Sequence, residues 1–115
     1  MEVMNSNDLK PTIEHEGSCS TWFFYDKGSL KMQTAGTYVE YISEFTTVDG
    51  AKLDPHEHDS HEYYYILRGR AVMEIEGERR TVGTGDLIYI PPNALHSIEP
   101  EANSDFRAFA FAAHN

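Results

Sequence analysis

Residues 50–69 read GAKLDPHEHDSHEYYYILRG and hold three of the chain's six histidines. His56 and His58 are two residues apart, so on an extended strand both side chains point to the same face. Glu62 follows after a gap that allows a tight bend into a neighbouring strand. Two imidazoles and one carboxylate that converge in this way suit a divalent transition metal. Taken alone, the pattern fits an ordinary polar loop equally well.

A second stretch, residues 85–96, reads GDLIYIPPNALH. Its apolar run stops at Pro91-Pro92, because proline cannot continue a hydrogen-bonded ladder. His96 lies beyond this stop, on or beside another strand. It is therefore a candidate to complete the histidine set from across a barrel.

Short strand-like segments separated by turn residues make up the rest of the chain from residue 38 onward. No window repeats its apolar residues with the helical period, and short strands at about 8–12-residue spacing indicate an all-β sandwich or barrel. Gly77 marks a hairpin between two of these strands. Residues 1–20 are polar and are expected to form an irregular arm, followed by an apolar stretch, Trp22–Tyr25, that packs onto the body. Strands are expected at residues 38–48, 62–67, 71–76, 79–82, 87–90 and 106–111.

Fixed residues in these two stretches resemble the paired motifs of the cupin superfamily. The first motif is matched by Gly50, His56, His58, Glu62 and Gly69, and the second by Gly85, Pro91 and His96. The resemblance implies an all-β, cupin-type jelly-roll β-barrel. We expect a short N-terminal arm over residues 1–20 and a single cupin domain over residues 21–115.

Two positions depart from the second motif. Asn93 stands where the family usually has glycine, and Pro100 stands where it has asparagine. Asparagine tolerates the left-handed backbone conformation, so the turn at Asn93 is expected to survive. Neither position carries a metal ligand, and the implied site is unaffected.

The resemblance implies that His56, His58, Glu62 and His96 hold one divalent transition metal ion, of the group Fe, Mn, Zn, Ni, Co and Cu. Three neutral imidazoles and one carboxylate leave such an ion with a net positive charge. Four protein ligands on a six-coordinate ion leave two adjacent positions open. Such a centre suits a small anionic or oxygen-chelating molecule.

Strand alternation assigns roles to the neighbours of Glu62. Tyr64 and Ile66 share its face and should point inward, which makes Tyr64 the candidate catalytic residue, as a hydrogen-bond donor to a bound ligand. Tyr63 and Tyr65 should point outward and could be covered by another subunit. His61 should also face away from the metal.

The remaining histidines, His15 and His114, lie near the chain ends and are expected to be solvated. Glu40 and Glu44, on the strand before the first motif, are further acid–base candidates. Alternation puts both on one face, which could be the solvent face.

The composition of the chain limits the classes of partner that it can bind and indicates where it resides. The net charge of −10 disfavours nucleic acid and anionic membrane surfaces. The single cysteine, Cys19, cannot form an intramolecular disulfide, which suits a reducing compartment, and the polar N-terminus does not resemble a secretory signal. We therefore expect a cytoplasmic protein, with a homodimer as the assembly.

Three functions stay open from the sequence. The favoured one is a metal-dependent oxygenase that acts on a small chelating acid. The second is a non-redox isomerase or lyase that uses the metal as a Lewis acid. The third is a binding or sensory module without turnover, since one fold hosts many functions.

Overall fold

The structure is a computed structural model that describes residues 2, 4–30 and 38–115. Within these residues the chain forms ten strands and two single-turn 3-10 helices, η1 (Ser6–Asp8) and η2 (Val48–Gly50). Neither of these short helices has the length or the apolar character needed to cross a membrane.

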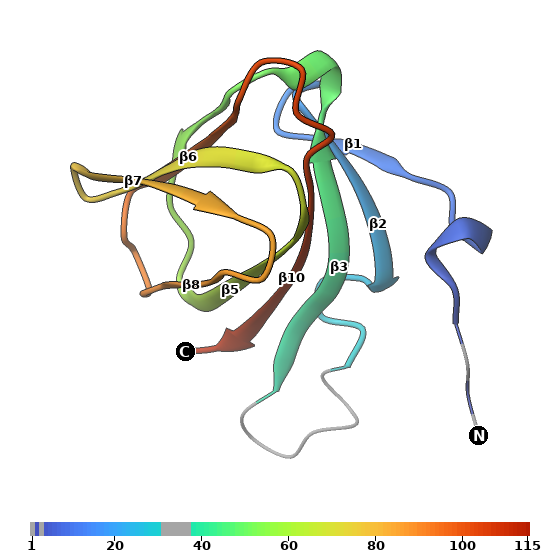
Figure 1. Ribbon diagram of the computed structural model, residues 1–115. Coiled ribbons are helices and arrows are strands. Elements are labelled where there is room, and N and C mark those ends of the chain that lie inside the picture. Colours follow the sequence, from blue (N-terminus) through green and yellow to red (C-terminus); the bar gives the residue numbers. More distant parts are fainter. Residues whose placement is uncertain (1, 3, 31–37) are drawn as a thin grey trace.

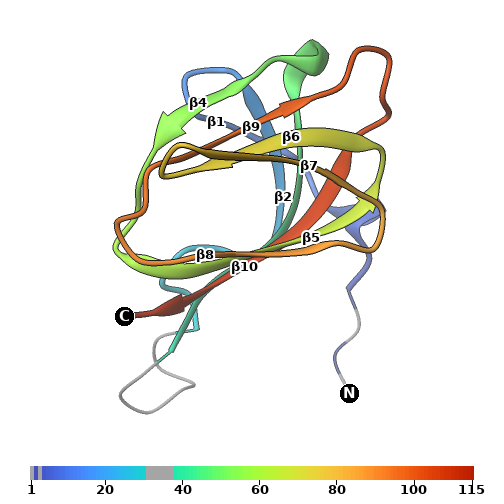
Figure 2. The same ribbon diagram turned by 60° about the vertical axis from the view of Figure 1, so that its left-hand side comes forward.

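The strands form two antiparallel sheets that face each other as two layers (Figures 1 and 2). The larger sheet has the order β1-β2-β3-β10-β5-β8, and the smaller sheet has the order β4-β9-β6-β7. The larger sheet consists of β1 (Thr12–Glu14), β2 (Cys19–Tyr25), β3 (Val39–Thr47), β10 (Arg107–His114), β5 (Ser60–Arg68) and β8 (Leu87–Ile90). The smaller sheet consists of β4 (Leu53–His56), β9 (His96–Pro100), β6 (Arg70–Ile75) and β7 (Glu78–Gly83).

The core lies between the two layers and is filled by alternate residues of each strand. Ile66, Ile90 and Ile98 are almost completely buried there. The sequence of β10 alternates alanine and phenylalanine over residues 108–111, and its alanines face inward. These small side chains fill little of the interior, which leaves space in the middle of the barrel.

Two turns show why particular residues are required. Gly69 separates β5 from β6, and a Cβ atom at this position would lie 2.7 Å from the Cα of Phe106. The β6–β7 hairpin turns through Glu76 and Gly77, both with positive φ, which is the backbone that a two-residue hairpin prefers.

The six strands expected from the sequence are confirmed to within a few residues. The irregular conformation expected for residues 1–20 is wrong in part, because Thr12–Glu14 pair with Cys19–Thr21. Both faces of β1 are largely exposed, so burial does not impose an alternation of apolar and polar residues on its sequence. The division into an arm of residues 1–20 and a barrel of residues 21–115 stays a prediction.

Candidate metal centre

Three histidines and one glutamate meet where the two sheets approach each other. His56 is the last residue of β4 and pairs with His96, the first residue of β9. Glu62 lies on β5 in the opposite sheet. His58 is in the link between β4 and β5, not on a strand as expected, because β4 ends at His56. The four side chains nevertheless come together.

The three imidazoles form a tight group. The His56 ring centroid lies 4.8 Å from that of His58 and 4.2 Å from that of His96, and the His58 and His96 rings are 5.5 Å apart. One potential ligand atom from each of the three lies within 4.8 Å of the others. Glu62 Oε2 lies 3.5 Å from His58 Nε2 and 3.3 Å from His96 Nε2.

Backbone carbonyls fix the tautomer of two of these histidines. His56 Nδ1 lies 2.8 Å from the carbonyl oxygen of Asp54, and His96 Nδ1 lies 2.8 Å from that of Ala94. Because a carbonyl oxygen can only accept, each Nδ1 donates its hydrogen, and each neutral ring turns a lone pair at Nε2 toward the cluster. Such a second hydrogen bond is what a metal-binding histidine normally makes.

The inner atoms of the cluster have no hydrogen-bond partner. His56 Nε2, His96 Nε2 and Glu62 Oε2 are all buried and unpaired. His96 is 2% exposed and Glu62 is 3% exposed, so water does not substitute freely. Acceptor atoms that face each other without a donor repel, and a cation between them removes the repulsion. The donor set therefore fits a divalent metal ion.

Electrostatics keep His56, His58 and Glu62 in their ligating forms. Burial lowers the pKa of His56 from its ordinary value of 6.5 to about 4. Burial also lowers the pKa of His58. For Glu62 burial acts in the opposite direction, but the neighbouring imidazoles and the Tyr41 hydroxyl outweigh it and lower the pKa of the carboxyl. At neutral pH His56 and His58 are thus neutral imidazoles and Glu62 is a carboxylate.

Tyr41 is a residue of this site that the sequence reasoning missed. Its hydroxyl donates a hydrogen bond to Glu62 Oε1, which leaves Oε2 directed at the histidines. Burial, together with the charge of Glu62, raises the pKa of Tyr41 well above its ordinary value, so the hydroxyl stays protonated. Tyr41 lies on the same face of β3 as Ser43 and Phe45, which are both buried. The available signal in the sequence was strand alternation, which puts residues 41, 43 and 45 on one face.

Tyr64 faces the interior as predicted. It is 4% exposed, and its ring lies 4.9 Å from that of Phe45 and 6.4 Å from that of His96. Burial raises the pKa of its hydroxyl well above 10, so Tyr64 can donate a hydrogen bond but cannot act as a base at neutral pH. Its catalytic role stays a prediction.

A small cavity of about 50 Å³ lies next to the cluster: His15, Tyr41 and Tyr64 line it, whereas none of the four candidate ligands does. Its walls are apolar and aromatic, and charged or titratable side chains gather at one part of its lining. The wall residues include Phe45, Leu53, Tyr41, Tyr64 and Ala110, and the charged or titratable group comprises Glu14, His15 and Lys27.

Other predicted neighbours lie away from the cavity. His61 Nδ1 lies 2.7 Å from the hydroxyl of Tyr89 on the outer face, which agrees with strand alternation. Glu44 forms an ion pair of 2.9 Å with Arg107, so it does not serve the site. Asn93 has a φ of 61°, which confirms that asparagine supports the turn of the second motif.

His15 is a second residue that the sequence reasoning missed. Its side chain is partly open to solvent, as expected, but its ring centroid lies 4.4 Å from that of His56 and 6.3 Å from that of His58. No local pattern signals this contact, because residues 15 and 56 meet only through the packing of the β1–β2 turn against β4.

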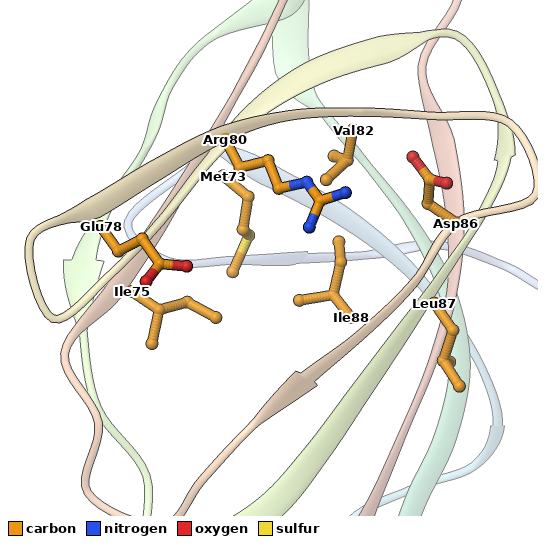
Figure 3. Close-up of a pocket in the computed structure, with 8 residues that line it drawn as sticks. All are labelled: Met73, Ile75, Glu78, Arg80, Val82, Asp86, Leu87 and Ile88. Atoms are coloured by element: carbon orange, nitrogen blue, oxygen red, sulfur yellow. The ribbon is translucent and has the colours of Figure 1, made fainter.

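A larger hollow lies between the β6–β7 hairpin and β8 (Figure 3). Its volume is about 230 Å³, and it shares no lining residue with the cavity beside the histidines. Apolar side chains form its floor, and three charged side chains stand around them. The lining consists of Met73, Ile75, Val82, Leu87, Ile88, Glu78, Arg80 and Asp86.

Known proteins resemble this chain both in sequence and in fold. The family model described as "Cupin domain" matches residues 43–111, which is more than half of the chain. An uncharacterised protein of Methanocaldococcus jannaschii is 47% identical over 63 residues, a stretch that covers 54% of this chain and 50% of the relative. The chain spans about half the length of the curated relatives it matches.

Solved structures share the fold at low sequence identity. A structure described as a predicted oxalate decarboxylase from Thermotoga maritima superposes with a TM-score of 0.83 at 21% identity, covering 99% of this chain and 100% of that one. The polyketide cyclase RemF from Streptomyces resistomycificus gives a TM-score of 0.78, also at 21% identity, covering 100% of this chain and 80% of that one. At this identity the likeness extends to the fold alone.

Proposed function

Because the chain belongs to the cupin domain family, we propose that it is a metal-dependent enzyme that acts on a small oxygen-chelating anion, with oxygenase-type chemistry favoured. The observation that carries the proposal is the set of unpaired atoms in the histidine cluster. His56 Nε2, His96 Nε2 and Glu62 Oε2 converge there, buried and without hydrogen-bond partners.

In this proposal His56, His58, Glu62 and His96 hold one divalent first-row metal ion. A bound ion would supply a Lewis-acidic centre and, where it is redox-active, a route for electrons between substrate and dioxygen. Tyr41 holds the Glu62 carboxylate through Oε1 and so orients Oε2 toward the histidines. This positioning matters because outer hydrogen bonds set both the geometry and the basicity of metal-binding groups.

The substrate would enter the cavity beside the cluster. Aromatic and apolar walls lower the local dielectric and strengthen the attraction between a cationic centre and an anion. Lys27 lines the same cavity and adds a positive charge. Tyr64, which stays protonated, would donate a hydrogen bond to the bound anion and orient it.

A non-redox isomerase or lyase is the second candidate. The observation that favours it is the group of titratable side chains in the cavity lining, Glu14, His15 and Lys27, which could move a proton to or from a bound acid. A binding module without turnover is the remaining possibility, and the same experiments separate the three.

Metal loading and ligand titration test the proposal. Protein prepared without chelators is loaded with Mn, Fe, Co, Ni, Cu or Zn, and the cobalt form is titrated with oxalate, acetylacetone and a catechol while its absorption spectrum is recorded. Oxalate comes first, because it is a small chelating dianion and the similar structure from T. maritima is described as a predicted oxalate decarboxylase.

We expect close to one metal ion per chain and a spectral change with at least one chelating anion. Oxygen uptake by the iron or manganese form would favour the oxygenase, and turnover of the zinc form without oxygen would favour the isomerase or lyase. Folded protein that takes up none of these metals would overturn the proposal. His61→Ala is the matched control, because His61 contacts Tyr89 on the outer face.

We further propose that the protein is a homodimer that pairs through the outer face of the larger sheet. Tyr63 stacks on Phe111 at 4.7 Å, and Leu87 and Tyr65 are 62% and 43% exposed. In a chain with a net charge of −10, two copies would associate where charges are sparse. Light scattering after size exclusion should report a dimer, and Leu87→Glu should shift it toward the monomer.

We also propose a cytoplasmic location for the protein, as expected from its single cysteine, Cys19.

A further inference from the structure

His15 lies on the four-residue turn that joins β1 to β2 and reaches the edge of the histidine cluster. The backbone nitrogen and the hydroxyl of Ser18 both donate hydrogen bonds to the carbonyl oxygen of His15, at 3.2 and 2.7 Å. His15 and Glu16 both have left-handed backbone angles, φ 51° and 56°. The turn therefore holds the His15 backbone in a defined place beside His56.

The ring spacings can be compared with those around a six-coordinate metal. With a metal–nitrogen distance of about 2.1 Å, and with the ring centroid roughly 1.1 Å beyond the nitrogen, adjacent imidazoles have centroids about 4.5 Å apart and opposite ones about 6.4 Å apart. The His56 ring is 4.8 and 4.2 Å from those of His58 and His96, near the spacing of adjacent ligands, whereas the His58 and His96 rings are 5.5 Å apart. The His15 ring is 4.4 Å from that of His56 and 6.3 Å from that of His58.

We propose that His15 is a fourth imidazole ligand of the metal, on the side of the cluster next to His56. This inference rests on the proposed metal site. His15 is not in the group of ligand atoms that lie within 4.8 Å of one another, so its side chain must rotate inward to bind. The His15 side chain is exposed and borders a pocket of about 350 Å³, so neighbouring residues do not enclose it.

The extra ligand has a consequence for the substrate. His56, His58, Glu62 and His96 leave two positions open on a six-coordinate ion, and His15 would occupy one of them. A chelating anion needs both positions, so it would displace the His15 ring toward the outer pocket. His15 would thus close the metal site when no anion is bound and would move aside for a bidentate one.

Counting the bound imidazoles tests the proposal directly. The full-length protein is loaded with Cu²⁺, and pulsed electron paramagnetic resonance counts the coordinated ring nitrogens with and without oxalate. His15→Asn is the main variant, because asparagine tolerates the left-handed backbone at this position, and His15→Gln is the second. His61→Asn is the matched control on the outer face. A chelator-competition titration measures metal affinity in each protein.

We expect four coordinated imidazoles in the wild type, three in both His15 variants, and three in the wild type after oxalate is added. Metal affinity should fall about tenfold in the His15 variants and stay unchanged in His61→Asn. An unchanged imidazole count and affinity in both His15 variants, with metal still bound, would overturn the role of His15 and leave the metal site intact. A wild type that binds no metal would instead overturn the proposed function, and this inference with it.

Discussion

Two hollows among the described residues differ in character: the small cavity beside the histidine cluster, and the groove between the β6–β7 hairpin and β8 (Figure 3). The groove is the larger, with about 230 Å³ against about 50 Å³. Its charged side chains, Glu78 and Arg80 among them, are exposed and keep their contact with water. The atoms at the histidine cluster are buried and unpaired. Convergence of unsatisfied ligand atoms, rather than volume, distinguishes the functional candidate.

The two regions also differ in what their polar residues do for the fold. A buried polar atom without a partner costs about 1–3 kcal/mol, so the histidine cluster destabilises the metal-free protein. In the groove, Glu78 and Arg80 stand on β7, the last strand of the smaller sheet among the described residues, on the same face as Met73 and Ile75. Inward-pointing charges on an edge strand hinder pairing with another chain. The charges on β7 therefore match the arrangement by which edge strands avoid pairing with another chain.

The largest effect should come from His96. His96→Ala removes a buried ligand, and we expect metal affinity to fall more than about 100-fold, because loss of an outer partner alone costs about 10–100-fold. Chelator competition in the cobalt form measures the change. Arg80→Ala in the groove is the control and should bind metal as the wild type does. Equal losses in both variants would remove the distinction between the two hollows.

Tyr41→Phe should have the next largest effect. The variant removes the hydroxyl that donates to Glu62 Oε1 while the ring stays in place. We expect metal affinity to fall about 10–100-fold, as is typical when the partner of a ligand is lost. Tyr89→Phe, which loses the hydroxyl beside His61 on the outer face, should leave affinity unchanged. No loss in Tyr41→Phe would show that Glu62 needs no such support.

Acidification should destabilise the metal-free histidine cluster. The pKa of His56 is about 4 in the folded protein against 6.5 in the unfolded chain, and burial also lowers the pKa of His58. Between these values the unfolded state binds more protons, so metal-free stability is full above about pH 6.5 and falls as the pH drops toward 4. Thermal unfolding as a function of pH measures this change.

Metal should be lost over an overlapping range, roughly pH 6 to 4, because protons compete for the imidazoles. In His56→Ala the part of the pH dependence of stability that arises from His56 should disappear. Undiminished metal affinity at pH 4 would contradict a site built on three histidines.

The smallest effect is expected in the groove itself. Arg80→Met replaces an exposed cation with an apolar side chain of similar length, and surface substitutions of this kind change stability by about 0.5 kcal/mol or less. Metal affinity should not change. The loss of an inward-pointing charge should instead increase association at the β7 edge, which sedimentation at rising protein concentration would reveal. A loss of metal binding would show that the groove and the cluster communicate.

The sequence by itself determined six of the strands from residue 38 onward and the hairpin at Gly77, and its resemblance to a known family pointed to the histidines of the cluster. These features depend on local rules: side chains alternate along a strand, glycine and asparagine accept positive φ, and a motif keeps its spacing. The inward face of Tyr64 and the outward face of His61 followed from the same alternation.

Only the tertiary structure decided which distant residues join the cluster. Tyr41 meets Glu62, and His15 meets His56, through contacts between segments 21 and 41 residues apart in sequence. His58 also turned out to lie in a link, and residues 12–14 to pair at the sheet edge. Such features depend on how the sheets pack and where each strand ends, and local spacing carries no record of either.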